Sequence, residues 1–233
     1  MERFNGVALE DVAPVTISGV YVKPPKIKPK WEDRPVNSGA HFIRTRYEER
    51  TIEISFYLPV VDAEERAEYI AAINAWAHSS EPMQLEISKR PGKYIMAVLS
   101  KLPSPSVGKW WEKLSIEFEA GDPFFYDSGL TAAPIGTSFK IDSVYGAVDA
   151  HIKWTNPSEA SSPAWVLDET TTITISGSVA AGAVVLYVDP IAATLDGDSV
   201  MDQVTIASRP FELTYGVHVI AGNGTLFYRE RCL

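Results

Sequence analysis

Residues 51–58 read Thr-Ile-Glu-Ile-Ser-Phe-Tyr-Leu, a stretch in which the apolar side chains fall at every second position. In an extended strand, Ile52, Ile54 and Phe56 lie on one face, and the residues between them lie on the other. A period of two is typical of a strand that buries one face in a core. The sequence therefore predicts that the first part of the chain is built on a β-sheet.

The segment that follows, from Asp62 to about His78, has the pattern of a helix. Asp62 can accept a hydrogen bond from a free backbone N–H of the first turn, and Glu65 stands three residues later, as in a capping box. The charged residues Glu64, Arg66 and Glu68 lie mostly outside the apolar stripe. That stripe has three- and four-residue spacing and is predicted to be buried; it consists of Tyr69, Ile70, Ile73, Trp76 and Ala77.

Further strands are expected on both sides of this helix. Residues 15–22 suggest an early strand, and residues 41–46 are predicted to pair with residues 51–58 through a connection at 47–50. Later strands are predicted at 83–88, 94–100 and 110–120. Residues 24–38 hold four prolines and many charges. Because proline cannot donate a hydrogen bond, this segment cannot be central sheet and is predicted to be a loop or arm.

The composition changes near residue 128, where Lys and Arg become rare and Thr, Ser, Ala, Gly and Val dominate. The small and polar stretch 128–135 is predicted to be a linker between a domain at 1–127 and a domain at 136–233. Short strands without helical periodicity predict a β-sandwich in the second domain; the candidates are residues 138–141, 148–154, 164–167, 171–176, 183–188, 204–207, 217–221 and 225–231. Asn223-Gly224 between the last two predicts a type I′ hairpin.

The predicted fold class is therefore mainly β. The first domain is a β-sheet or sandwich with one α-helix (α+β), and a β-sandwich follows. The net charge of the chain is −9. Residues 1–127 carry 16 basic and 19 acidic groups, and residues 128–233 carry five and 11. Neither part has the basic excess that gripping nucleic acid requires.

The chain has no apolar run that approaches the 20 or so residues needed to span a bilayer, and its first residues do not resemble a signal peptide. We expect a protein that is soluble where it is made and does not insert into membranes. The one cysteine, Cys232, cannot form an intrachain disulfide or a multi-thiolate zinc site.

The sequence contains no pattern that identifies a catalytic, cofactor-binding or metal-binding residue. The four histidines have no metal-ligand spacing, and they are predicted to be surface or strand residues: His41, His78, His151 and His218. The chain has no nucleophile elbow, P-loop or dinucleotide-binding motif. We expect a protein that is not an enzyme and needs no cofactor.

Three alternatives remain open at this point. Glu112, Glu117 and Glu119 are close enough in sequence to be weighed as the paired carboxylates of a glycosidase, although they also suit a solvated strand face. The run from Asp196 to Asp202 is predicted to be an acidic β-turn rather than a calcium loop. Aromatic residues are weighed as a surface for sugars against a place in the core; they are Trp154, Trp165 and Tyr187.

The order of elements from Gly39 to Tyr126 resembles a known family. The segments that carry the resemblance are Arg44–Ile54, the helix ending in Ile73-Asn74-Ala75-Trp76, the strands 85–88, 94–100 and 114–119, and Gly121-Asp122-Pro123-Phe124-Phe125. Residues 213–220 with 225–232 are similar to the closing strands of the family's second domain. The chain resembles the distal tail protein of long, flexible-tailed (siphovirus-type) bacteriophages.

This resemblance implies a structural protein of the phage tail tip. Six copies would form a homohexameric ring through the first domain, and galectin-like β-sandwiches would project outward. The ring would join the tail tube protein to the tail-tip hub protein, beside the tape-measure protein, in the virion assembled in the host cytoplasm. DNA would pass through as cargo, which an acidic chain suits. Within this reading, residues 24–38 and the edges of the first domain are the expected subunit contacts.

Two rival functions follow from the same residues. The second domain would be a carbohydrate-binding module if it recognises a host saccharide through Trp154, Trp165 or Tyr187. The chain would instead be a tail tube subunit if it polymerises beyond a single ring. A glycosidase would require two carboxylates that converge in a groove.

Overall fold

The structure is a computed structural model, which describes residues 1–33, 39–59, 62–103, 111–156, 160–188, 190–205 and 208–233. The chain forms two compact units, one of Met1–Phe125 together with Leu233 and one of Tyr126–Cys232. The boundary therefore lies two residues before the position predicted from composition. In the described part of the chain, no helix is both long and apolar enough to cross a membrane.

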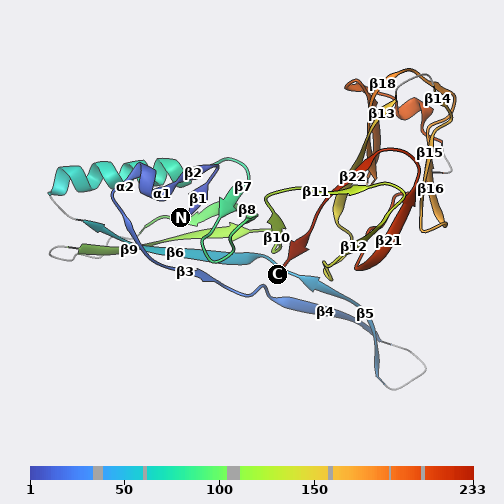
Figure 1. Ribbon diagram of the computed structural model, residues 1–233. Helices are drawn as coiled ribbons and strands as arrows, with labels where there is room; N and C mark the ends of the chain where they lie inside the picture. The colour runs from blue at the N-terminus through green and yellow to red at the C-terminus, as the bar shows by residue number, and fades with distance from the viewer. Residues whose placement is uncertain (34–38, 60–61, 104–110, 157–159, 189, 206–207) are drawn as a thin grey trace. The chain divides into compact units, whose positions relative to one another are not determined.

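The first unit is built on one antiparallel sheet with a helix across it (Figure 1). Its strand order is β2-β1-β7-β8-β9-β6-β3. Its elements are β1 (Arg3–Phe4), β2 (Val7–Ala8), α1 (Leu9–Val12), β3 (Thr16–Val22), β4 (Ile27–Asp33), β5 (Ala40–Tyr47), β6 (Arg50–Pro59), α2 (Ala63–Ala77), β7 (Met83–Glu86), β8 (Lys93–Lys101), β9 (Trp111–Ala120) and, at the boundary, β10 (Phe125–Asp127).

The core of this unit follows from the period of two in β6 and β9. Ile54 stands opposite Ile116 in the register, Phe56 opposite Leu114, and all of these side chains are buried. Helix α2 covers this face, with Ile73 fully buried. The predicted burial of the alternating strand face is confirmed.

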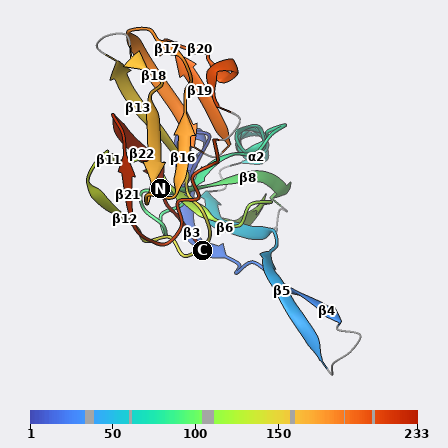
Figure 2. The same cartoon turned by 90° about the vertical axis from the view of Figure 1, so that its right-hand side faces the viewer.

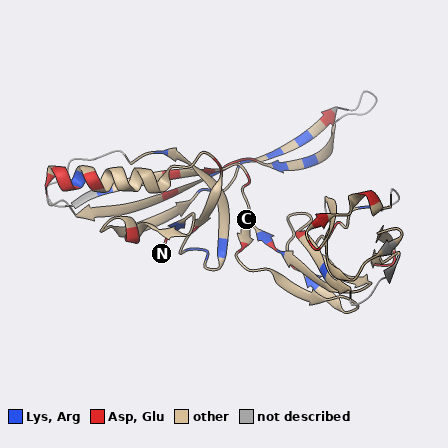
Figure 3. Cartoon of the chain, turned by 90° about the horizontal axis from the view of Figure 1, so that it is seen from above, with Lys and Arg blue, Asp and Glu red and all other residues tan. Residues whose placement is uncertain are grey.

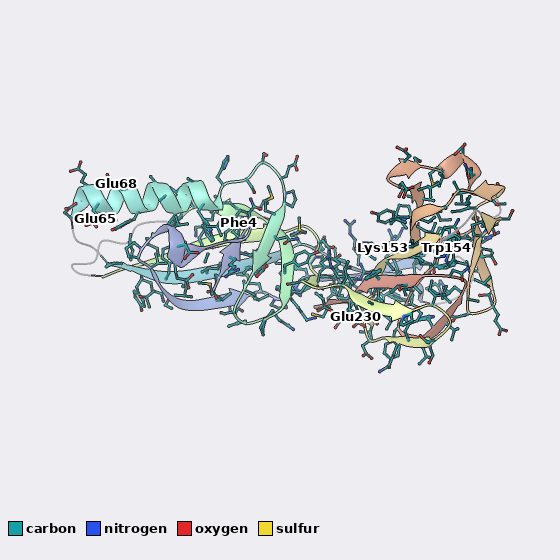
Figure 4. The ribbon with its side chains drawn as sticks, turned by 45° about the horizontal axis from the view of Figure 1, so that its top comes forward. Phe4, Glu65, Glu68, Lys153, Trp154 and Glu230 are labelled. Atoms are coloured by element: carbon teal, nitrogen blue, oxygen red, sulfur yellow. The ribbon has the colours of Figure 1, made fainter. Side chains whose placement is uncertain are left out.

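Helix α2 begins where the sequence predicts. Oδ1 of Asp62 accepts hydrogen bonds from the backbone N–H groups of Glu64 and Glu65, at 3.0 and 2.8 Å. The indole of Trp76 packs edge-on against Phe4 and Phe118, with ring centroids 5.8 and 6.0 Å away. Figure 4 labels Phe4 beneath the helix. A second helix, the one-turn α1, was not predicted from the sequence.

One predicted strand pairing in the first unit is wrong. Residues 41–46 do not pair with residues 51–58, because β5 pairs with β4 in a separate two-stranded sheet. The Pro-rich segment, predicted to be a loop or arm outside the central sheet, lies in this separate ribbon and forms a strand over Ile27–Asp33. Pro29 is tolerated because the ribbon has only two strands, so each strand has an outer edge that needs no N–H donor.

The second unit is a sandwich of two antiparallel sheets. Six strands run in the order β11-β22-β13-β18-β19-β20, and four run in the order β12-β21-β15-β16. Its elements are β11 (Thr131–Pro134), β12 (Ser138–Ile141), β13 (Asp149–Asn156), β14 (Ala160–Ser161), β15 (Ala164–Leu167), β16 (Thr171–Thr174), β17 (Ser178–Val179), β18 (Gly182–Val188), β19 (Ile191–Leu195), β20 (Asp198–Ser199), η1 (Met201–Gln203), β21 (Gly216–Ala221), β22 (Thr225–Arg229) and β23 (Arg231–Cys232).

The core of the sandwich lies between the two sheets. Ile152 and Leu186 contribute from the larger sheet, and Trp165, Ile173 and Ile220 contribute from the smaller one. The predicted β-sandwich is confirmed, and so is the mainly β fold class. Most of the predicted strands are present, but at residues 204–207 the prediction is not met: Val204 makes only an isolated bridge to Ile175, and 206–207 lie outside the described residues.

Two further predictions are wrong in this unit. The proposed linker at 128–135 contains strand β11, which pairs with β22. Asn223-Gly224 does not close a hairpin, because β21 and β22 belong to different sheets. The chain instead crosses from one sheet to the other at this point, and Trp165 fixes the crossing by donating from Nε1 to the carbonyl oxygen of Asn223 at 2.8 Å.

Candidate assembly interface

The ribbon formed by β4 and β5 projects beyond the sheet of its own unit (Figure 2). Its strands pair from Ile27↔Tyr47 to Asp33↔Ala40, with an irregularity between Lys30 and Trp31. A two-stranded ribbon has no layer packed on either face, so both faces meet solvent in the isolated chain. We refer to residues 27–33 and 40–47 as the arm.

One face of the arm carries a ladder of positive charge. Lys28 stands opposite Arg46, and Lys30 stands opposite Arg44. Like charges placed directly opposite each other destabilise a pair of strands. Lys28 is relieved by an ion pair with Glu48. Figure 3 shows the basic residues along the ribbon in blue. The arm is therefore shaped to receive an anionic surface.

The opposite face of the arm is apolar. Successive side chains alternate in β4, so Ile27 and Trp31 point away from the face of Lys28 and Lys30. Trp31 packs edge-on against Phe42 at a centroid distance of 5.3 Å. Ile27 is nevertheless 61% exposed and Trp31 57% exposed. Large side chains so exposed on a projecting ribbon are typical of a binding surface.

An acidic surface lies at the start of α2. Glu64 and Glu68 are exposed and lie one turn apart, and Figure 4 shows Glu65 and Glu68 at this end of the helix. The carboxylate of Glu65 accepts a hydrogen bond of 2.6 Å from the hydroxyl of Tyr69. This bond, with lesser contributions from burial and the nearby acidic groups, raises the pKa of Tyr69. The first turns of α2 thus form a concentrated negative site.

Strand β3 offers another surface, because it is the last strand in the order of the sheet. Its far side has no partner among the strands of the described residues. The backbone groups of such an edge can pair with a strand from another chain. Tyr21 on this strand is exposed. The arm and β3 lie in the region where the sequence predicts subunit contacts, at residues 24–38 and the domain edges.

Two of the carboxylates weighed for glycoside cleavage, Glu117 and Glu119, lie on the solvent side of β9. Glu117 is held by Lys101 and Lys23, with N–O distances of 3.5 and 3.9 Å. Glu119 is exposed, and the side chain of Glu112 lies outside the described residues. A carboxylate held between two ammonium groups suits a salt-bridged strand face.

The acidic run at 196–202 contains the turn between β19 and β20. Asp196 and Gly197 both have positive φ, and Leu195 stands opposite Asp198. Oδ1 of Asp196 accepts from the backbone N–H of Ala183 at 2.7 Å. The predicted acidic β-turn is confirmed. Within the described ranges, no group of three or more potential metal ligands comes together.

The aromatic residues weighed as a sugar surface have three different positions. Trp165 cannot contact a sugar, because its side chain is fully buried in the sandwich core. Trp154 is half-buried, on the same inner face, with its ring edge-on to Trp165 at 5.9 Å. Tyr187 is 47% exposed on the outer face of the six-stranded sheet.

Sequence reasoning identified the arm but missed its two faces. The signal is present in the alternation of Ile27-Lys28-Pro29-Lys30-Trp31 and in Arg44-Thr45-Arg46. The four prolines of residues 24–38 outweigh this alternation in a prediction, because proline argues against a strand. The four cations form a ladder only through the register between β4 and β5, which the sequence does not reveal.

Residues 10–120 match the family of the phage tail protein RIFT-related domain. This match lies within the first unit and covers 111 of the 233 residues. The fold of the chain is that of a distal tail protein. The chain superposes on Dit of phage SPP1, described as a paradigm of the hub adsorption apparatus in phages that infect Gram-positive hosts. The TM-score is 0.84 at 15% identity, over 100% of this chain and 98% of that one.

Two chains of the phage p2 baseplate in its activated conformation are less similar. The chain from the form with Sr gives a TM-score of 0.49 at 10% identity, over 94% of this chain and 91% of that one. The chain from the form with Ca gives 0.47 at 11% identity, over 92% of each. No curated protein matches the sequence significantly. The resemblance predicted from the sequence is confirmed by the family match and by the SPP1 fold.

Proposed function

We propose that this protein is a structural subunit of the phage tail tip, in which six copies close into a ring through the first unit. The ring joins the tail tube to the tail-tip hub and the host-adhesion apparatus. The observation that carries the proposal is the arm, which exposes a basic ladder on one face and large apolar side chains on the other. Such a ribbon gains stability by lying between other surfaces.

The contact that we infer is heterologous, as ring closure requires, since one patch meets a different patch on the next copy. The basic face of the arm meets the acidic start of α2 on its neighbour. Arg44 and Arg46 suit carboxylates because a guanidinium can donate two parallel hydrogen bonds to one carboxylate. Glu64 and Glu68 supply two such groups on one helical face. Their association relieves the like-charge pairs within the arm.

The apolar face of the arm contributes affinity, whereas the charges contribute specificity and orientation. Fully burying a side chain as large as Ile27 or Phe42 contributes about 1.5–3 kcal/mol. Trp31 is the kind of residue that dominates interface energies. Edge strand β3 provides a further place where a neighbouring copy can add backbone hydrogen bonds.

In this proposal the protein acts by position rather than by catalysis, in the virion at the tail tip after assembly in the host cytoplasm. Its partners are further copies of itself, the tail tube protein, the tail-tip hub protein and the tape-measure protein. DNA passes through the ring as cargo. The net charge of −9 suits that task, because a strongly cationic chain would retain DNA by its phosphates.

The test is a charge exchange in the full chain, measured by light scattering and native mass spectrometry over a range of concentrations. The unmodified chain should form hexamers, alone or with its tail tube protein. Arg44→Glu with Arg46→Glu should prevent assembly, and so should Glu64→Lys with Glu68→Lys. Combining the two pairs should restore it. A control pair with an equal charge change, Lys89→Glu with Lys140→Glu, should assemble normally.

Two outcomes contradict the proposal at different levels. Normal hexamers from both charge-reversed pairs would exclude the arm–α2 contact but leave the ring. A chain that stays monomeric at every concentration, with and without the tail tube protein, would exclude the ring itself. Open filaments in place of a closed ring would favour a tail tube subunit.

A further inference from the structure

A row of three rings crosses the outer face of the six-stranded sheet. His151 on β13 stands opposite Tyr187 on β18 and opposite Phe227 on β22 in the strand registers. The His151 ring stacks on Phe227 at a centroid distance of 5.5 Å and lies 5.6 Å from the Tyr187 ring. We refer to these three residues as the aromatic row. Tyr187 is its most exposed member.

Two cationic side chains flank the aromatic row. Nζ of Lys153 lies over the Phe227 ring, 5.3 Å from its centroid. Arg229 follows two residues after Phe227 and so shares its face of β22. Burial first, and then the charges of Lys153 and Arg229, lower the pKa of His151. The local field is therefore positive, although only five of the 21 basic residues lie in 128–233.

A pocket of about 410 Å³ lies beside the aromatic row and is lined by Arg229. His151 and Tyr187 line it together with Asp149, which stands opposite Arg229 in the register. Leu130 and Pro190 complete its walls. This volume is within the range of small-molecule sites, which combine apolar walls with a few polar groups.

The polar atoms of the row are available to a ligand. Within the described residues, neither the ring nitrogens of His151 nor the hydroxyl of Tyr187 has a hydrogen-bond partner. Lys153 and Trp154 are consecutive residues of β13, marked in Figure 4, and they alternate between the solvent face and the core. The outer face thus combines one exposed ring and two half-buried ones with two cations and with the hydrogen-bonding atoms of His151 and Tyr187.

We propose that the aromatic row, with Lys153 and Arg229, binds an anionic saccharide whose sugar rings carry carboxylate or phosphate groups. One face of a pyranose presents C–H groups, which pack on an aromatic ring such as Tyr187. Its hydroxyl groups can bond to His151 and to the carboxylate of Asp149. Lys153 and Arg229 hold the anionic substituent, because ammonium and guanidinium groups form the stronger, charge-assisted hydrogen bonds.

A nucleic acid would also offer flat rings and phosphates, but the charge of the unit favours a saccharide. Residues 128–233 carry 11 acidic groups against five basic ones. A polymer with a phosphate at every unit would meet net repulsion from this sandwich, whereas a sparsely charged glycan meets the local positive site. The inference goes beyond the proposed ring function, since neither the arm nor α2 takes part in it.

The test is binding by the full chain, measured by calorimetry with two soluble probes, hyaluronan oligosaccharides, which carry a carboxylate on every second sugar, and a sparsely phosphorylated mannan. At least one probe should bind, more weakly as salt concentration rises. Tyr187→Ala and Lys153→Gln should each weaken binding about tenfold or more, which corresponds to about 1.4 kcal/mol. Matched controls, Lys140→Gln on β12 of the other sheet and Tyr215→Ala directly before β21, should leave binding unchanged.

Binding of the carboxylate probe alone, or of the phosphate probe alone, supports the proposal and identifies the anion. Failure of both probes overturns it, and so does equal binding of neutral dextran. Tighter binding of oligothymidylate would assign the surface to single-stranded nucleic acid instead. Unchanged binding in Tyr187→Ala, with an unaltered circular dichroism spectrum, would place the ligand elsewhere. None of these results depends on whether the chain forms a ring.

Discussion

Nδ1 of His218 lies 2.7 Å from Oδ2 of Asp168, and this pair fastens strand β21 to the turn between β15 and β16. Nε2 of His218 lies 2.7 Å from the carbonyl oxygen of Thr214. Oδ1 of Asp168 also accepts from the backbone N–H of Val219 at 2.8 Å. Both neighbours of the imidazole are oxygen atoms, so the ring is positioned at both of its nitrogens.

Asp168→Ala should lower the free energy of unfolding by about 1–3 kcal/mol, because it leaves the buried His218 without its acceptor. Asp168 also has a φ of +47°, a conformation that alanine tolerates poorly. Asp168→Asn is the matched variant, since asparagine tolerates this φ and keeps one acceptor, and its loss should be smaller. Urea unfolding measures both values. Equal stability of the unmodified chain and Asp168→Ala would contradict this account.

Gly222→Ala should destabilise the second unit, because there is no room for a methyl group at this position. A Cβ there would lie 2.6 Å from Cδ1 of Trp165 and 3.0 Å from the carbonyl oxygen of Ala164, and the φ of Gly222 is +141°. We expect a loss of about 1–3 kcal/mol from overpacking. At Gly129, where no atom lies within 4 Å of a built Cβ, the same change should be nearly neutral. Thermal unfolding of the two variants distinguishes them.

Ile73→Ala should cost about 2–5 kcal/mol, because the side chain is fully buried between α2 and the sheet. Trp76→Ala should fall near the lower end of the 3–5 kcal/mol typical of buried tryptophan. Trp76 is only half-buried, but its Nε1 donates to the carbonyl oxygen of Val7 at 3.0 Å. The control is Glu68→Ala on the exposed side of the helix. In chemical denaturation, Ile73→Ala and Trp76→Ala should each lose much more unfolding free energy than Glu68→Ala.

The sequence alone predicts the structure correctly where a local rule determines it. The period of two in β6 and β9 identifies the buried face, and Asp62 marks the start of α2. The same alternation does not identify the partner strand. Residues 41–46 alternate as a hairpin partner of β6 would, but they pair with β4. The strands on either side of Asn223-Gly224 also have a hairpin-like pattern, but they belong to different sheets.

The candidate surfaces were harder to predict because they depend on register between distant segments. The aromatic row exists because His151 meets both Tyr187 and Phe227 across strands. The sequence leaves Trp165 open as a sugar-binding residue, since no local pattern distinguishes a tryptophan that faces the core from one that faces solvent. His151 was predicted only to be a surface or strand residue, and the structure gives it a specific electrostatic environment.

His151 should make the second unit less stable at mildly acid pH. Burial, with Lys153 on β13 and Arg229 on β22, places the pKa of the folded imidazole below its ordinary value of 6.5. The pocket also brings in Asp149 and the Tyr187 hydroxyl, and neither outweighs these causes. As pH falls through 6.5 toward the lower folded value, the unfolded chain binds a proton that the folded chain does not. Acidification therefore favours unfolding in this window.

His151→Gln should remove this part of the pH dependence. Its thermal midpoint should fall less than that of the unmodified chain between about pH 7.5 and about pH 5.5, the range in which an ordinary histidine changes charge. His78→Gln, at the exposed end of α2, should retain the full decrease. Calorimetry at matched ionic strength gives the three curves. A His151→Gln curve parallel to that of the unmodified chain would show that His151 is not the group that opposes protonation, because a neutral side chain cannot contribute to the proton difference between folded and unfolded states.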